Sequence, residues 1–114
     1  MESINRAIAI IKPKQPFIDW INSEPSDTVK YTLETISQEN LTFLIPEYDD
    51  PDDALRFIKK HFTSIFEFEL FGWCTNEESW PANRTWKMFQ EWFDVQIHSE
   101  VFDLLDENIE KEEM

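Results

Sequence analysis

Glu69 is the residue whose position raises the clearest chemical question in this sequence. On a helical wheel it falls near the centre of an apolar face, beside Phe62, Ile65 and Trp73. An unpaired ionised carboxylate costs several kcal/mol in such surroundings, so Glu69 must be paired, hydrogen-bonded or neutral. A neutral carboxyl group of this kind could also act as a general acid or base.

The three arginines of the chain are the candidate partners for Glu69. Arg56 lies on the opposite side of the same expected helix, which leaves Arg84 and Arg6. We expect Glu69 to be buried and to bridge to one of these two, which would fix the expected helices on the sheet. Two alternatives stay open: an edge position for Glu69, or a functional carboxylate.

Histidine and cysteine are too scarce to indicate a metal site. His61, His98 and Cys74 are the only residues of these types, whereas structural zinc takes four ligands and catalytic zinc usually three. We therefore expect neither a metal nor a cofactor. We expect His61 at the edge of the long helix's apolar face. His98 follows Gln96 on the polar face of an expected strand, where it either lines a groove or is solvated.

Nucleophilic and nucleotide-binding signatures are also missing from the sequence. Cys74 could pair with a histidine, but Gly72-Trp73-Cys74 is typical of a helix end. With one glycine, the chain can contain neither a GxGxxG nor a GxxxxGK[ST] loop. The usual nucleotide-binding fingerprints are therefore excluded.

Lys12 and Lys14 form the one locally basic segment, between an expected strand and an expected helix N-terminus. They could hold an anion there, or they could be solvated loop residues. A second candidate binding residue is Trp80, which precedes Pro81 in a loop and is the tryptophan we expect to be most exposed. The aromatic residues that follow it share one helix face and indicate the wall of a core: Trp86, Phe89, Trp92 and Phe93.

The charge balance restricts the partners. The chain has 24 Asp and Glu against 10 Lys and Arg, a net charge of −14. A nucleic-acid binder needs a basic stripe, and an anionic membrane would repel this protein, so we expect neither partner. Such acidity either serves solubility alone or attracts a basic protein.

The remaining composition indicates one folded cytoplasmic domain. Ten Phe, five Trp and two Tyr supply an aromatic core and exclude disorder for the body of the chain. The apolar run 7–11 is too short for a secretory or membrane-spanning segment, and a single cysteine gives no internal disulfide. We expect a globular domain over 1–105 and a frayed acidic tail over 106–114.

The periodicity predicts an α+β fold, in which a small three-stranded, mostly antiparallel sheet packs against a long helix and shorter helices. The long helix is expected at about 51–71, with Asp50 as its cap, Pro51 in its first turn and Gly72 in a left-handed conformation at its end. Strands are expected at 6–12, 41–46 and 95–103. Shorter helices are expected from Pro16 to before Pro25, and at 33–39 and 83–93.

Three segments carry a resemblance to known proteins: NRAIAIIKPKQPFIDWIN, LIPEYDDPDDAL and WPANRTWKMFQEWFDVQIHSEVFDLL. Together they resemble an uncharacterised family of short acidic bacterial proteins with no assigned function. The resemblance covers about residues 5–105 and implies a small stand-alone bacterial protein. It implies no site residue.

Two classes of function follow from these observations. The first is a non-enzymatic interaction or inhibitor protein that uses its acidic surface to bind a basic protein. The alternative is a small enzyme or small-molecule binder with a pocket around Glu69, Arg84 and His98, lined by Trp80 and Trp86. We favour the first because no catalytic set is complete. Partner, substrate and oligomeric state are left open.

Overall fold

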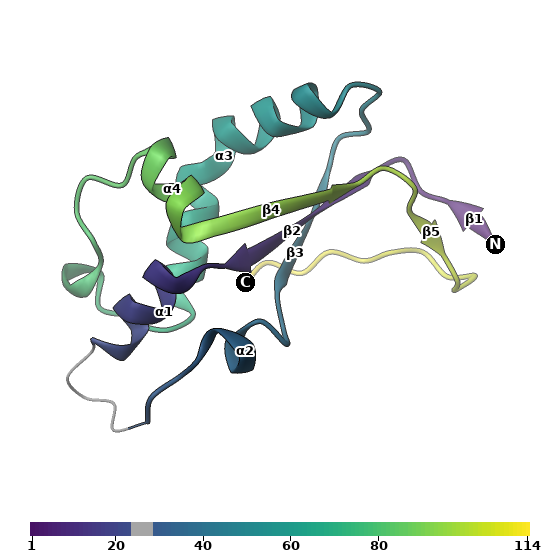
Figure 1. Cartoon of the computed structure of the whole chain (residues 1–114). Helices are drawn as coiled ribbons and strands as arrows, with labels where there is room; N and C mark the ends of the chain where they lie inside the picture. The colour runs from purple at the N-terminus through teal and green to yellow at the C-terminus, as the bar shows by residue number, and fades with distance from the viewer. Residues whose placement is uncertain (24–28) are drawn as a thin grey trace.

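The computed structural model describes residues 1–23 and 29–114. Within them, strand β2 (Ala7–Pro13) lies at the centre of a three-stranded antiparallel sheet, between β3 (Leu41–Ile45) and β4 (Phe93–His98) (Figure 1). A separate antiparallel pair joins β1 (Glu2–Ser3) to β5 (Phe102–Asp103) at the end of the molecule away from α1 (Gln15–Asn22). The predicted α+β class and three-stranded sheet are confirmed.

Alternation along the central strand shows which face of the sheet is covered. Ala7, Ala9, Ile11 and Pro13 are buried, while the residues between them are half-buried. This period of two is the signature of a strand with one face against the core. Pro13 is the last residue of the strand, because proline has no N–H to continue the ladder.

Helix α3 (Pro51–Phe71) covers the buried face and contacts both β3 and α4 (Trp86–Trp92). Helix α1 packs against α4 and against the single turn α2 (Leu33–Ile36), so three short helices gather at one end of the sheet (Figure 1). A 3₁₀ turn, η1 (Glu77–Ser79), lies in the connection between α3 and α4.

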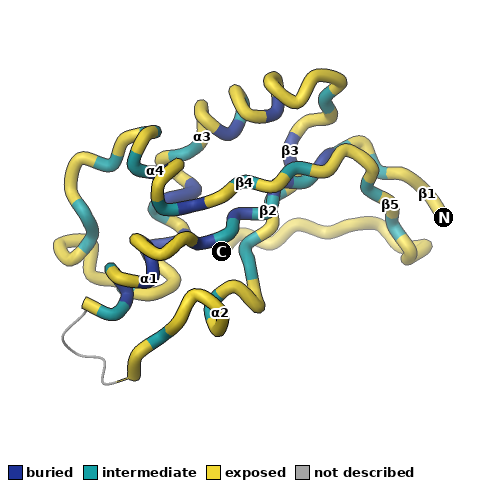
Figure 2. Tube along the Cα trace, in the orientation of Figure 1, coloured by how far each residue is buried: buried dark blue, intermediate teal, exposed yellow. Residues whose placement is uncertain are grey.

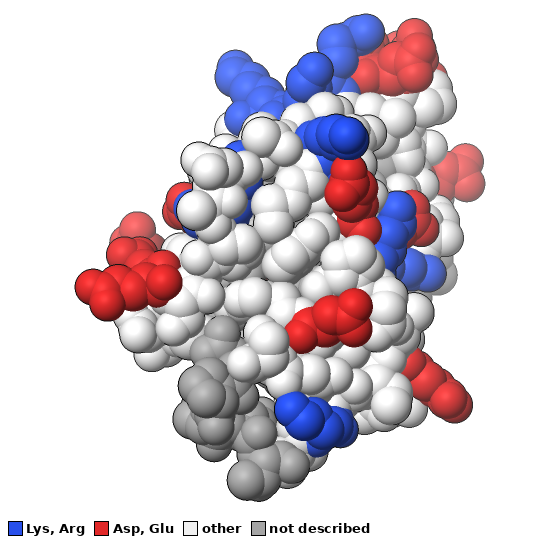
Figure 3. All heavy atoms as spheres, turned by 60° about the vertical axis from the view of Figure 1, so that its left-hand side comes forward, with Lys and Arg blue, Asp and Glu red and all other residues white. Residues whose placement is uncertain are grey.

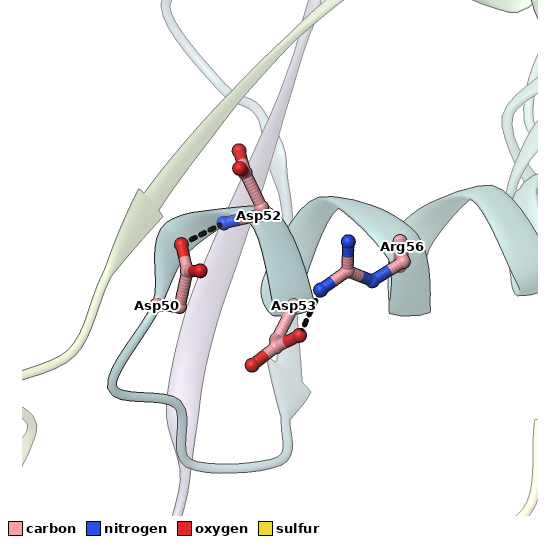
Figure 4. A network of polar contacts seen from close by, with 4 residues as sticks. All are labelled: Asp50, Asp52, Asp53 and Arg56. Carbon is pink, nitrogen blue, oxygen red and sulfur yellow. Dashed lines mark hydrogen bonds and ion pairs between the residues drawn. The ribbon is translucent and has the colours of Figure 1, made fainter.

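The start of α3 matches its prediction. The carboxylate of Asp50 accepts a hydrogen bond from the backbone N–H of Asp52 at 2.9 Å (Figure 4). Pro51 occupies the first helical position. One turn later, Asp53 forms an ion pair with Arg56 (Figure 4). The acidic run at 49–53 is therefore a helix start, where carboxylates complement the dipole.

The predicted left-handed glycine at the end of α3 is wrong. Gly72 is right-handed, with φ of −62°, and a Cβ built there would lie no closer than 3.5 Å to the carbonyl oxygen of Glu69. The last turn instead closes through the N–H groups of Trp73 and Cys74, which both donate to the carbonyl of Leu70. Within residues 1–23 and 29–114, the left-handed residue is instead Asn83, with φ of 56°, an amino acid that tolerates this conformation.

Three boundaries are corrected by capping and pairing. The helix expected over 83–93 begins at Trp86, because Thr85 caps it by accepting from the N–H of Met88 at 3.1 Å. The helix expected over 33–39 ends at Ile36. The strand expected over 95–103 is divided into β4 and β5, because pairing with β2 stops at His98 and β5 pairs with β1.

One hydrophobic cluster forms the core between the sheet and the helices (Figure 2). Phe66 on α3 lies at its centre, with ring centroids of Phe89, Trp92 and Phe93 within 5.4–5.9 Å. Phe89 and Phe93 are buried, and Trp86 and Trp92 are half-buried. The predicted aromatic wall around α4 is therefore confirmed.

The acidic segment 104–114 follows β5 without any helix or strand, and all its residues are exposed (Figure 2). Across the described residues, no helix combines the length and apolarity needed to cross a membrane.

Candidate functional site

Glu69 is the one buried polar or charged residue in the described parts of the chain, with 8% of its surface exposed. It lies in the last turn of α3, after the core residues Ile65 and Phe66 and before Leu70. The predicted burial is therefore confirmed, and the alternative of an edge position is wrong. The apolar face of α3 places the carboxyl group in the core because helical periodicity continues through it.

The predicted bridge from Glu69 to an arginine is wrong. The Nη2 atom of Arg84 donates to Oε1 of Glu67 at 3.2 Å, and Nη1 of Arg84 donates to the carbonyl oxygen of Pro81 at 2.8 Å. Arg6 donates to the carbonyl oxygen of Asn5 instead. Two helical positions separate Glu67 from Glu69, which turns their side chains by about 200°. Arg84 therefore lies on the face of α3 that carries Glu67 and not on the face that carries Glu69.

Burial without a partner sets the protonation of Glu69. Its Oε1 atom is shielded from solvent and has no hydrogen-bond partner among the described residues. Desolvation disfavours the charged form and raises the pKa of Glu69 from 4.5 to about 7. Near neutral pH this carboxyl group therefore exists in both forms.

A cavity of about 570 Å³ lies beside Glu69. It is lined by the end of β2, by α1, by the last turns of α3, and by α2 with the residues that follow it, and it is partly open to solvent. Most of its described lining is apolar or aromatic, and the described residues that line it are Ile11, Pro13, Phe17, Tyr31, Thr35, Ile36, Glu39, Asn40, Leu41, Phe68, Glu69, Gly72 and Trp73.

Asn40 gives the cavity a second unsatisfied acceptor. Its side-chain Nδ2 donates to the carbonyl oxygen of Ser37 at 3.2 Å, but its Oδ1 is buried without a hydrogen-bond partner in the described structure. Buried acceptors without donors are uncommon in folded proteins. Glu69 and Asn40 thus bring two of them to the lining of one cavity.

Arg84 and His98 do not join Glu69, so the pocket predicted around all three is wrong. His98 is exposed and lies opposite Ile8 on β2, whereas the cavity meets β2 at Ile11 and Pro13. At about 3.3 Å per residue, this separates His98 from the cavity by roughly 10 Å along the strand. His61 is exposed, with its ring 4.4 Å from that of Phe57.

Trp80 is not the most exposed tryptophan. Its Nε1 donates to the carbonyl oxygen of Cys74 at 2.8 Å, its ring lies 5.7 Å from the guanidinium carbon of Arg84, and it is half-buried. These contacts hold the connection between α3 and α4 together. Neither Trp80 nor Trp86 lines the cavity. Trp73 does line it, and Trp73 is 38% exposed.

Lys12 and Lys14 contact neighbouring secondary-structure elements. The Nζ atom of Lys14 donates to the carbonyl oxygen of Gln90 at 2.8 Å, in the last turn of α4, where a cation complements the helix dipole. The backbone N–H of Lys14 also donates to the carbonyl oxygen of Trp92 at 2.7 Å. Lys12 pairs across the sheet with Asp94.

Neither a metal centre nor a relative directs the choice of site. Within residues 1–23 and 29–114, no group of three or more His, Cys, Asp or Glu side chains could hold a metal ion. Comparison of the chain with family models, with curated proteins and with solved structures gives no match. The resemblance to a bacterial family stays a prediction, and the cavity beside Glu69 is the candidate site.

Proposed function

We propose that this protein binds a small organic ligand in the cavity beside Glu69. The observation that carries the proposal is a buried carboxyl group with an unpartnered oxygen in the lining of a largely apolar cavity. Ligand sites in proteins commonly combine apolar walls with a few convergent polar groups, in cavities of about 300–1,000 Å³. The volume of about 570 Å³ lies within that range.

Binding without turnover fits the lining better than catalysis. The residues that line the cavity in the described parts of the chain include no His, Cys, Lys or Arg. Glu69 therefore has no second acid or base of these types, and no activated cysteine or lysine, within the site. The proposal keeps the small-molecule alternative drawn from the sequence, but it replaces Arg84 and His98 with Asn40 and Trp73.

A screen of small organic compounds tests the proposal. Backbone amide NMR shifts should identify compounds that perturb Tyr31, Asn40 and Trp73, all of which line the cavity. Because an aromatic wall contributes on the order of 1 kcal/mol or more to such contacts, Trp73→Ala should weaken these compounds by about tenfold. The measurement is the dissociation constant from the shift titration.

Phe71 supplies the matched control for this screen. It is an aromatic residue two positions from Trp73, is 56% exposed and does not line the cavity. Phe71→Ala should leave the dissociation constants unchanged. The proposal fails if no compound perturbs the cavity residues, or if both alanine variants bind equally well.

We propose a second function for the acidic end of the chain: association with a basic protein. Residues 104–114 are exposed, and they interleave carboxylates with the exposed apolar side chains of Leu104, Leu105 and Ile109. The face drawn in Figure 3 instead carries basic and acidic groups scattered among uncharged residues. The C-terminal segment therefore supports this proposal better than that face does.

A further inference from the structure

We propose that the ligand of the Glu69 cavity is an organic cation, specifically a primary ammonium group on an apolar, ring-sized body. This inference rests on the proposed small-molecule function. It concerns the chemical class of the ligand, which the shape of the cavity alone does not decide. Three properties of the lining point to this class.

The first property is the sign of charge. Among the described residues of the lining, two carry carboxyl groups, Glu69 and Glu39, and none carries a basic side chain. An anionic ligand would find no counter-charge in this lining and would meet a desolvated carboxylate. Arg84 forms its ion pair with Glu67 and not with Glu69. A cationic ligand would supply the counter-charge to Glu69 instead.

The second property is the supply of hydrogen-bond donors. The two buried unpartnered atoms of the lining, Oε1 of Glu69 and Oδ1 of Asn40, are both acceptors. An ionised carboxylate can only accept, and the amide N–H₂ of Asn40 is already directed to Ser37. A primary ammonium group carries three donors in a small volume and no acceptor, so it matches acceptors of this kind.

The third property is the aromatic lining. Phe17, Phe68, Tyr31 and Trp73 contribute rings, and those of Tyr31 and Trp73 meet edge to face with centroids 5.0 Å apart. Ring faces attract cations, and apolar walls favour an apolar ligand body. A hydrated metal ion offers no such body, so an arylalkyl ammonium compound complements the lining better.

Three probes with nearly the same shape separate charge from shape: phenethylammonium, phenethyl alcohol and phenylacetate. We expect phenethylammonium to bind at least about tenfold more tightly than the alcohol, because charge-assisted hydrogen bonds are stronger than neutral ones. Phenylacetate should not bind measurably. Isothermal titration calorimetry gives the constants, and NMR shifts at Asn40 and Trp73 confirm the site.

Two glutamine variants, one inside the lining and one outside it, form a matched pair. Glu69→Gln should abolish the preference for phenethylammonium over the alcohol, because it removes the charge and keeps the side-chain shape. Glu34→Gln removes the same charge from an exposed position outside the lining and should change the preference less than about threefold. Phenethyltrimethylammonium has no N–H donor and should bind about tenfold more weakly than phenethylammonium.

The outcomes separate this inference from the proposed function. If the alcohol or phenylacetate binds at Asn40 and Trp73 as tightly as the amine, the cavity is a ligand site and the cation inference is overturned. Equal loss in both glutamine variants also overturns the inference. If neither these probes nor any compound of the wider screen occupies the cavity, the proposed function itself fails.

A measurement on the unaltered protein covers the case in which Glu69→Gln does not fold. A cation that binds the ionised carboxylate should release protons near pH 7, because Glu69 is partly protonated there before binding. The other titratable groups among the described residues of the lining are Tyr31 and Glu39. Calorimetry in two buffers of different ionisation enthalpy measures the release. Proton uptake, or no change, would overturn the inference.

Discussion

Glu69 occupies a position on α3 where its neighbours Ile65, Phe66 and Leu70 are all buried and apolar. The fold gives its Oε1 atom no donor within the described residues. Leaving a buried carboxyl group without a partner costs stability, and such local conflicts occur where proteins keep functional sites. This is the physical reason for placing the candidate site at Glu69.

Stability should fall as the pH rises through the titration of Glu69. In the folded state its pKa is about 7, above the ordinary 4.5. Between these values the folded protein holds a proton that the unfolded chain has released, so the free energy of unfolding decreases with pH. The full penalty, about 3 kcal/mol, applies above pH 7. Glu69→Gln should remove this part of the pH dependence.

Urea unfolding at pH 5 and at pH 8 measures this effect for the wild type, for Glu69→Gln and for Glu39→Gln. The wild type and Glu39→Gln should both lose stability between the two pH values. The loss of stability in Glu69→Gln should be smaller than the loss in the wild type, by up to about 3 kcal/mol. An equal loss in all three proteins would show that Glu69 does not titrate in this range.

The burial of Glu69 could be predicted from the sequence, but its partner could not. Burial follows from helical periodicity, which is a local property of α3. The pairing of Arg84 with Glu67 depends on the path of the connection between α3 and α4, including the left-handed Asn83. Trp73 was expected on the apolar face of the helix but was not predicted as a site residue. Tyr31 and Asn40 approach Trp73 only in the folded chain, so helical periodicity could not show that the three residues line one cavity.

Among the elements, α3 was predicted with both of its ends, because local chemistry determines where it begins and where its periodicity stops. Asp50 and the acidic residues of the first turn lie within a few positions of one another (Figure 4), and Pro51 lies between them in the sequence. The two-residue strands β1 and β5 lack such a signal. Their pairing joins opposite ends of the chain, so periodicity could not reveal it.

Replacing the cap of α3 should destabilise the protein. Asp50→Ala removes the hydrogen bond that the N–H of Asp52 donates at 2.9 Å, and it leaves that N–H without the cap. We expect a loss of about 1 kcal/mol in the free energy of unfolding, measured by urea denaturation.

Asp49 provides the control for this loss. It is exposed, has the same charge and directly precedes the cap residue. Asp49→Ala should change stability by less than about 0.5 kcal/mol. If the two alanine variants are equally destabilised, the loss comes from the acidic charge near the helix start and not from the capping hydrogen bond.

For the whole molecule, the fold class could be predicted and the cavity could not. Alternation and helical faces identify the strands, the long helix and the aromatic core from single segments. The cavity combines residues of β2, α1 and α3 with the segment around α2, and these segments are separated in the sequence. Its existence is a property of tertiary packing, so no single segment indicates it.

The acidic excess is also a property of the whole chain, and it leads to a test of the proposed basic partner. Five carboxylates lie in the exposed C-terminal segment: Asp106, Glu107, Glu110, Glu112 and Glu113. The wild type should capture one basic protein in stoichiometric amount from a bacterial lysate at about 50 mM salt and lose it at about 0.5 M, because salt screens exposed charges. Converting these five residues to their amides should abolish capture at low salt.

A variant with the same net charge distinguishes the segment from acidity in general. Five other exposed glutamates provide it when they are converted to glutamine: Glu34, Glu39, Glu47, Glu77 and Glu78. This variant should keep the partner, because the carboxylates beside Leu104, Leu105 and Ile109 are unchanged. Loss of the partner in both variants would mean that net charge alone attracts it. Capture that survives 0.5 M salt would contradict an electrostatic association altogether.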